Sequence, residues 1–293
     1  MKKVLSVALL FTSMLCVYAQ KSKPSKTTAA APQEKILVIR LDDVGLCHAV
    51  NVGAEKIFST GMPISASLMA PCPWFEEAVL ILKKYPNVSV GIHLTLNAEW
   101  DHFKWGPVLG KSAVPSLVDS LGYFPSVVTW YYKDIFKLDE MEKELSAQIE
   151  KALNAGLKID YIDGHMGACG MTPEQEALML KLADKYKVGI SHRFGETGLR
   201  GADGYAKRTG KDDFIASFDT LKNKTYLVVS HPGSDTPEMQ ALTLKGTDVA
   251  KARAAVPEYI CSPEFADMIK RNNIKVLNYR QLIELKGLAS MKR

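Results

Sequence analysis

The chain has 293 residues, with 37 lysines and arginines against 32 aspartates and glutamates, so its formal net charge is +5. The excess comes from lysines among the first 33 residues, a stretch that contains no acidic residue. Residues 34–293 are therefore neutral overall, and their charge gives no indication of binding to nucleic acid or to a charged membrane face.

The start of the chain has the pattern of a secretory signal. Residues 1–19 begin with Lys2 and Lys3 and continue as an apolar run that ends in small residues at Ala19, where we expect cleavage. The run is shorter than the ~20 residues that a membrane span needs, so no stable span is expected. Residues 20–34 are rich in Lys, Ser, Thr, Ala and Pro and are predicted to form a flexible linker. The sequence thus predicts a periplasmic or secreted protein.

Residues 35–290 alternate short β-branched runs with helical patterns, which predicts a parallel sheet with helices packed on it. Seven strands over this length favour a single domain with a distorted (β/α) TIM-like barrel slightly over an open sheet. The predicted strands are residues 36–41, 64–69, 88–94, 159–162, 188–191, 226–230 and 274–277, and the predicted helices are residues 50–59, 74–84, 138–154, 173–186 and 263–272.

Residues 97–137 carry a group of aromatic side chains without a clear period. Such an insertion after a strand is either a packed lid or a surface on which sugars stack. We expect most of these rings to pack the insertion onto the barrel and one or two to face a ligand. They are Trp100, Trp105, Tyr123, Phe124, Trp130, Tyr131 and Tyr132.

Four cysteines follow the predicted signal: Cys47, Cys72, Cys169 and Cys261. No two of them form a CxxC pair, which argues against a structural zinc site. An oxidising compartment permits a disulfide, but the sequence does not assign a pairing. Four ordinary thiols are the favoured interpretation.

Polar residues gather where the predicted strands end. In a parallel barrel these ends open on one face, which is where barrel enzymes place their active sites. A lone histidine is more often structural, but several convergent strand ends favour a functional site. The residues concerned are Asp42, Asp43, His93, Asp163, His165, His192, Arg193 and His231.

One carboxylate and two neutral imidazoles suit a catalytic divalent ion with room for water, zinc being the usual choice. Non-haem iron oxygenases use the same ligand types, so the ligands alone do not define the reaction. The Asp42–Asp43 pair adds information, because a strand that ends there can turn both side chains toward the mouth. One carboxylate could then bind the ion while the other takes a proton from water.

At these residues the sequence resembles the YdjC-like carbohydrate deacetylases, which include chitooligosaccharide deacetylases. The segment LDDVGL at 41–46 is similar to the family's ADDFGL, and GIHL at 91–94 is similar to its GxHL. IDGH at 162–165 resembles IDSH, and SHPG at 230–233 resembles CHPG. The ordered series, together with NVG at 51–53, ISASLM at 64–69, FEEA at 75–78 and a closing region at 253–279, spans about residues 35–285.

The resemblance implies a distorted (β/α) barrel that hydrolyses the acetamido group of a sugar or oligosaccharide. It also implies that Asp43, His93 and His165 hold one divalent ion, Mg²⁺ or Zn²⁺. Asp42 would act as general base and His231 as general acid. The partner would be an N-acetylated saccharide, and a homodimer is compatible with the sequence.

Two further residues have roles that are less defined. Arg193 falls near a basic residue of the family's fifth strand end, which implies that it orients a carboxylate. Asp163 lies two residues before His165 and either holds that imidazole or is a turn residue before Gly164.

Two departures from the family bear on the substrate. Gly167 stands where the family usually has a second histidine, and export would bring the protein to glycan fragments outside the cell. A glycan-binding protein that has lost turnover is therefore one alternative. A glycoside hydrolase that pairs Asp42 or Asp43 with Glu258 is another.

Overall fold

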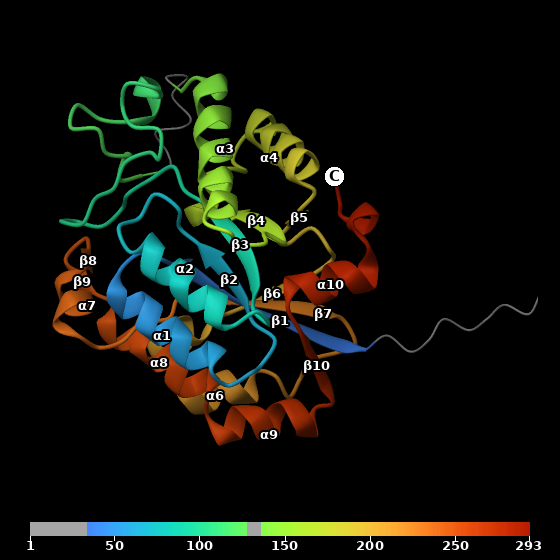
Figure 1. Cartoon of the computed structure of the whole chain (residues 1–293). Coiled ribbons are helices and arrows are strands. Elements are labelled where there is room, and N and C mark those ends of the chain that lie inside the picture. Colours follow the sequence, from blue (N-terminus) through green and yellow to red (C-terminus); the bar gives the residue numbers. More distant parts are fainter. Residues whose placement is uncertain (1–33, 128–135) are drawn as a thin grey trace, which may run out of the picture. The chain divides into compact units, whose positions relative to one another are not determined.

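Parallel strands form a curled sheet with helices packed around it (Figure 1). The computed structural model describes residues 34–127 and 136–293. The predicted signal peptide, nearly all of the predicted linker, and Trp130, Tyr131 and Tyr132 lie outside the described residues. The strands of the sheet are β1 Lys35–Val44, β2 Ser65–Leu68, β3 Ser89–Leu94, β4 Tyr161–Gly164, β5 Gly189–Ile190, β6 Thr197–Leu199, β7 Thr225–Ser230 and β10 Ile274–Leu277.

The strand order is β5-β4-β3-β2-β1-β7-β6, and β10 pairs with the first half of β1. Every pairing in this sheet is parallel, whereas β5 and β6 do not pair with each other, so the curl stays open. The predicted α/β fold with a distorted barrel is confirmed, and all seven predicted strands are present. The extra strand, β6, was not predicted because its three residues carry little apolar signal.

The five predicted helices are also present, with ends shifted by two residues at most. The chain adds several short helices and one longer one, α8, which contains Pro257 and therefore reads poorly as a helix. A capping box between Asn278 and Gln281 marks the start of α10, a helix that was not predicted although this sequence pattern indicates it. The helices are α1 His48–Phe58, α2 Phe75–Lys84, α3 Leu138–Asn154, α4 Pro173–Tyr186, α5 Ala202–Ala206, α6 Lys211–Ala216, α7 Pro237–Ala241, α8 Ala250–Ile260, α9 Pro263–Arg271 and α10 Tyr279–Lys286.

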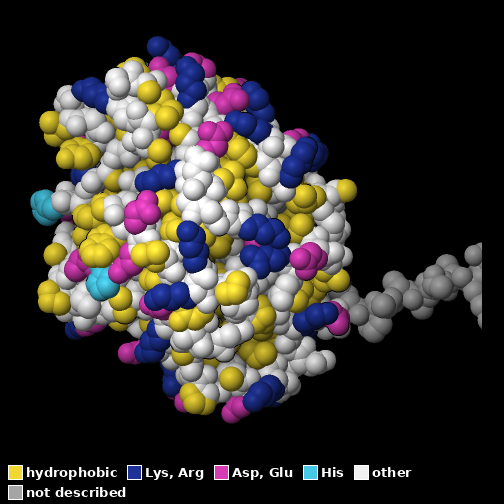
Figure 2. Space-filling view, in the orientation of Figure 1, with side chains coloured by type: hydrophobic (Ala, Val, Ile, Leu, Met, Phe, Trp, Pro, Cys, Tyr) yellow, Lys and Arg dark blue, Asp and Glu magenta, His cyan; other side chains and the backbone are white. Residues whose placement is uncertain are grey.

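Strand β1 forms the centre of the core. Leu37, Val38 and Ile39 are fully or almost fully buried, as expected for a parallel strand that is covered on both faces. Within the described residues, no helix has the length and apolar character needed to cross a membrane. The surface of the domain mixes basic and acidic side chains over the face that Figure 2 shows, in keeping with its overall neutrality.

In its described residues the insertion after β3 is mostly irregular, with one 3₁₀ turn at Pro115–Leu117. Trp100, Trp105 and Phe124 are buried, whereas Tyr123 is partly exposed. The Trp105 ring lies edge-on at 6.3 Å from the His165 ring. Packing therefore accounts for these buried rings, and the insertion forms part of the wall around the strand ends.

The four cysteines of the described chain are unpaired. Cys47, Cys72 and Cys169 are buried, and Cys261 is half-buried. Burial raises the pKa of each of the buried thiols, so they are neutral at physiological pH. This agrees with the interpretation of ordinary thiols.

Candidate active site

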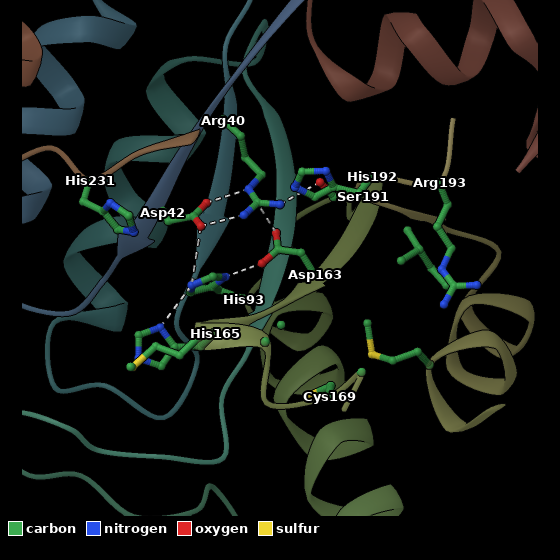
Figure 3. Close-up of a pocket in the computed structure, with 16 residues that line it drawn as sticks. Arg40, Asp42, His93, Asp163, His165, Cys169, Ser191, His192, Arg193 and His231 are labelled. Atoms are coloured by element: carbon green, nitrogen blue, oxygen red, sulfur yellow. Dashed lines mark hydrogen bonds and ion pairs between the residues drawn. The ribbon is translucent and has the colours of Figure 1, made fainter. Parts of the chain in front are cut away.

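The carboxyl ends of the strands surround a cavity of about 540 Å³ (Figure 3). Most of the residues singled out from the sequence contribute to its wall, although they come from five separate strands or the loops that follow them. The lining residues include Asp42, His93, Asp163, His165, Ser191 and His231.

The end of β1 is distorted in a way that turns two adjacent carboxylates, Asp42 and Asp43, toward His93. The register with β2 shifts between Leu41 and Val44, as in a β-bulge. Asp43 has a φ of 67°, a left-handed conformation that costs a non-glycine residue about 1–2 kcal/mol. Normal strand alternation would send Asp42 and Asp43 to opposite faces. The distortion is the physical basis for the predicted convergence of the pair.

Three potential ligand atoms meet at one point. Nδ1 of His165 lies 3.1 Å from Nε2 of His93 and 3.3 Å from Oδ1 of Asp43, and the remaining edge of this triangle is 3.5 Å. Atoms that bind one zinc ion tetrahedrally at 2.0–2.1 Å are roughly 3.3–3.4 Å apart. The predicted ligand set is therefore brought together with the spacing that a metal ion requires.

Hydrogen bonds on the outer side of each imidazole orient the inner nitrogens. Nδ1 of His93 bonds to Asp163, and Nε2 of His165 bonds to Glu99 at 2.9 Å. If each imidazole donates its proton to its carboxylate, the two nitrogens that face each other both carry lone pairs. Oδ1 of Asp43 faces the same point and has no hydrogen-bond donor among residues 34–127 and 136–293. Three electron-pair donors that face one another are stable when a cation lies between them.

The ionised groups around this point support a divalent charge. In the described part of the chain, four carboxylates meet two guanidinium groups, which leaves two negative charges. A divalent ion would balance these two negative charges while both imidazoles stay neutral. Protonation of both imidazoles would balance the same two charges in the absence of an ion. The groups are Asp42, Asp43, Glu99, Asp163, Arg40 and Arg253.

The pKa values of His93, His165 and Asp43 follow the same balance of charges. Burial disfavours the charged form of His93, but Asp163 and Asp42 raise its pKa to about 10. Burial acts likewise on His165, and Glu99 with Asp43 raises its pKa to about 9. Burial would raise the pKa of Asp43, but Arg253 and the two imidazoles hold it well below its usual range. The residues present therefore fit a divalent cation.

Asp42 is held in place by a guanidinium group from its own strand. Arg40 donates to both oxygens of Asp42, at 2.7 and 2.6 Å, and to the hydroxyl of Ser191 at 2.6 Å. Oδ2 of Asp42 lies 3.8 Å from Nε2 of His93. A carboxylate has about four lone-pair sites, so Asp42 can still accept a proton from a group in the cavity.

A second triad of candidate ligands, Asp42, His93 and Asp163, also lies close together. Both Asp42 oxygens accept bonds from Arg40. Asp163 accepts from His93 and from Ser67, with Arg40 3.7 Å away. These oxygens are already satisfied by the protein, so the triad that contains Asp43 is the better metal site.

His231 lies on another wall of the cavity, on the side opposite to Arg193 (Figure 3). Its Nδ1 contacts Asp203 at 3.2 Å, which leaves Nε2 as the nitrogen available to a ligand. The loop that carries it is packed closely, because a Cβ added at Gly53 of α1 would lie 2.5 Å from the Gly233 carbonyl oxygen. This contact explains the glycine at position 53, whereas a Cβ at Gly233 would lie 2.9 Å from Cβ of Arg253.

Three sequence-based expectations need correction. Arg193 was expected to orient a carboxylate of the site. It pairs with Glu176 at 3.4 Å and points away from Asp42 and Asp163 (Figure 3), and Arg40 orients Asp42. Asp163 does not hold His165. Because Asp163 stands opposite His93 in the register of β4 and β3, it bonds to His93.

The third correction concerns Glu258. This residue is exposed on α8 and does not line the cavity, so it cannot pair with Asp42 or Asp43 across a substrate bound there.

Sequence reasoning missed three charged residues. Glu99 supports His165 from the irregular insertion, and no spacing rule identifies it. Arg253 binds Oδ2 of Asp43 at 2.6 Å from α8, which was not predicted. Arg40 could have been found, because a charged residue inside an otherwise apolar central strand needs a partner.

A second cavity, of about 900 Å³, adjoins the first, since Met166 lines both. Its lining includes Glu99 and three lysines, and in the described chain none of the three ammonium groups lies within 4.0 Å of a carboxylate. The turn of the small β8–β9 hairpin (Thr243–Leu244 and Thr247–Asp248) contributes one of them and is fastened by Asp101. The lysines are Lys104, Lys207 and Lys245.

The fold and the site define an α/β half-barrel protein with a candidate metal site at its strand ends. The profile of the YdjC-like proteins matches residues 36–271, and the chain belongs to this family. A carbohydrate deacetylase of Thermoanaerobacter pseudethanolicus is 25% identical over 256 residues, which cover 84% of this chain and 98% of the relative. A carbohydrate deacetylase of Geobacillus stearothermophilus is 28% identical over 261 residues, covering 85% and 98%.

The fold also has a solved counterpart. A candidate cellobiose-phosphate cleavage protein of Enterococcus faecalis V583 superposes with a TM-score of 0.71 at 23% identity, over 85% of this chain and 99% of that one. At this identity the likeness concerns the fold alone.

Proposed function

We propose that this protein hydrolyses the N-acetyl amide of an acetamido sugar or oligosaccharide with a divalent ion held by Asp43, His93 and His165. The observation that carries the proposal is the meeting of three ligand atoms beside a separate, well-held carboxylate, Asp42. The carbohydrate deacetylases that match nearly full length support the same activity.

The ion, Mg²⁺ or Zn²⁺, would polarise the amide carbonyl and lower the pKa of the attacking water. Asp42 then accepts the proton of that water as general base. The two bonds from Arg40 keep the Asp42 carboxylate fixed during this transfer, so it does not need to reorganise.

His231 supplies the proton for the departing amine, which is otherwise a poor leaving group. Asp203 accepts from Nδ1 and stabilises the charged imidazole before the transfer. The proton donor and the proton acceptor thus act from different walls of one cavity, as the substrate amide between them requires.

Two alternatives remain testable beside this proposal. A glycoside hydrolase needs two carboxyl groups that flank the scissile bond, whereas Asp42 and Asp43 are neighbours that are bound to Arg40 and Arg253. A glycan-binding protein without turnover was suggested by Gly167. That residue has a φ of 74°, a conformation that disfavours a histidine, so its backbone has its own reason for glycine.

An acetate-release assay on N-acetylated oligosaccharides tests the proposal. The protein is stripped of metal and each divalent ion is restored separately. We expect acetate only after ion addition, with the sugar chain length unchanged. Shorter sugar products without acetate would indicate the glycosidase, and saturable sugar binding without any product would indicate the binding protein.

Removal of the Glu99 carboxylate tests the support of the metal site. We expect Glu99→Ala to weaken metal affinity or activity about 10- to 100-fold, because His165 loses the group that orients its imidazole. Titration calorimetry with the divalent ion measures the affinity. Glu284→Ala, at an exposed position of α10, is the matched control, and equal affinity in the two variants would contradict the role of Glu99.

We also propose that the protein is exported by cleavage of residues 1–19 and acts in the periplasm or outside the cell. The support is the basic and apolar pattern of that segment. The mass of the mature protein from a cell fraction checks this, since retention of Met1 through Ala19 in a cytoplasmic fraction would exclude export.

A further inference from the structure

The first cavity has two ends of different chemistry. One end contains the ligand atoms and Asp42, and the other has an apolar floor. Cys169, Met179 and Ile190 form this floor, and each is buried, with exposed fractions of 1%, 6% and 4%. Among the contacts of the described chain, the Cys169 thiol meets only the Leu94 carbonyl, at 3.7 Å. These three side chains themselves offer little to a hydroxyl group, whereas His192 and Arg193 also line the cavity.

Glycines between β4 and α4 keep the floor open. A Cβ added at Gly170 would meet no atom within 4 Å, and one at Gly167 would meet only Met171, at 3.7 Å. Both glycines line the cavity. A side chain at either position would therefore have room at the rim of this cavity.

The floor is directly connected to the reacting groups. Ile190 stands opposite Ile162 in the sheet, and the next residue, Ser191, accepts a hydrogen bond from Arg40, which holds Asp42. Gly164 immediately precedes His165. A carbonyl group placed at the ligand atoms can therefore direct its alkyl side into the same cavity.

The sugar has a better place elsewhere. Hydroxyl groups need polar partners, and the second cavity, beyond Met166, is lined by lysines and by Glu99 and Asp101. Its volume of about 900 Å³ exceeds the 540 Å³ of the first. The second cavity thus offers charged partners that the side chains of Cys169, Met179 and Ile190 do not.

We propose that the protein accepts amino sugars whose N-acyl group is longer than acetyl, with the alkyl chain on the floor of Cys169, Met179 and Ile190. The inference rests on the proposed function and extends its substrate class. Water adds its oxygen to the acyl carbon, the C–N bond breaks, and the products are a fatty carboxylate and the protonated amine. A methylene group takes about the space of one water, roughly 30 Å³, so several fit in this cavity.

A chain-length series tests the proposal. Release of the free acid is measured from three chitobiose substrates that differ only in their N-acyl group, which is acetyl, butanoyl or hexanoyl, with the divalent ion present. Each buried methylene can raise kcat/KM by up to about fourfold. We expect the butanoyl and hexanoyl substrates to match or exceed the acetyl substrate. A tenfold or larger preference for acetyl in the natural protein would overturn the proposal.

A cavity-filling variant locates the acyl chain. Gly170→Leu places a side chain in the open space, and we expect the hexanoyl-to-acetyl ratio of kcat/KM to fall at least about tenfold. Gly170→Ala is the matched control, with a smaller change in the ratio. If Gly170→Leu lowers kcat/KM equally for every chain length, the floor binds the sugar and the proposal is wrong.

Failure of the proposed function is distinguishable from failure of this inference. If no substrate releases its acid, deacylation itself is excluded. Calorimetric binding of the N-hexanoyl and N-acetyl compounds then still tests the floor. Tighter binding of the hexanoyl compound that Gly170→Leu abolishes supports an alkyl site, and equal binding of the two compounds rejects it.

Discussion

Replacement of Asp42 by asparagine is expected to lower kcat by about 10²- to 10⁴-fold, the usual contribution of a general base. Asparagine keeps the size of the side chain and still accepts one bond from Arg40, but it cannot take a proton from water. Because Asp42 is not in the preferred ligand triad, the divalent ion should remain bound. Acetate release and metal content are measured on the same sample.

Two controls separate chemistry from folding in this variant. Asp267→Asn changes an exposed carboxylate of α9 and should leave kcat unaltered. The thermal midpoint of Asp42→Asn reports the cost of leaving Arg40 with one carboxylate bond fewer. Full activity of Asp42→Asn would rule out its role as the base.

His93→Ala is expected to remove the divalent ion and with it the activity. The variant deletes one of three ligand atoms and also leaves the Asp163 carboxylate without its imidazole partner. We expect metal affinity to fall by about 100-fold or more, since loss of even an outer partner costs 10- to 100-fold. Elemental analysis after dialysis measures the ion-to-protein ratio.

His48→Ala is the matched control for this loss. His48 is an exposed histidine that stacks on Trp74 and pairs with Glu77, away from the ligand atoms. The His48→Ala variant should retain the divalent ion and the activity of the natural protein. A His93→Ala protein that keeps one tightly bound ion per chain would mean that the ion is held elsewhere.

Strand positions were predictable from sequence because the central strands are continuous β-branched runs. The same runs place Asp42, Asp43, His93 and His165 at strand ends, and parallel strands bring their ends to one face. Local sequence and a simple rule of topology therefore define much of the site.

The hydrogen-bond partners of these residues could not be predicted from the sequence, for a physical reason. The bond from His93 to Asp163 depends on the register between β3 and β4, which the spacing along one chain does not give. Glu99 lies in irregular structure, and Arg253 reaches Asp43 from a helix that contains a proline. Such contacts arise only when segments distant in sequence pack together.

The glycine contact between α1 and the loop after β7 ties the proposed proton donor to a distant helix. Gly53 lies against Gly233, two residues after His231, and Glu238 accepts from the first amides of α1. The position of the imidazole is thus determined partly by how closely two backbones approach. Substitutions on the face of α1 that contacts Gly233 are therefore expected to tune amine protonation without touching the cavity, so that turnover can be adjusted separately from substrate choice.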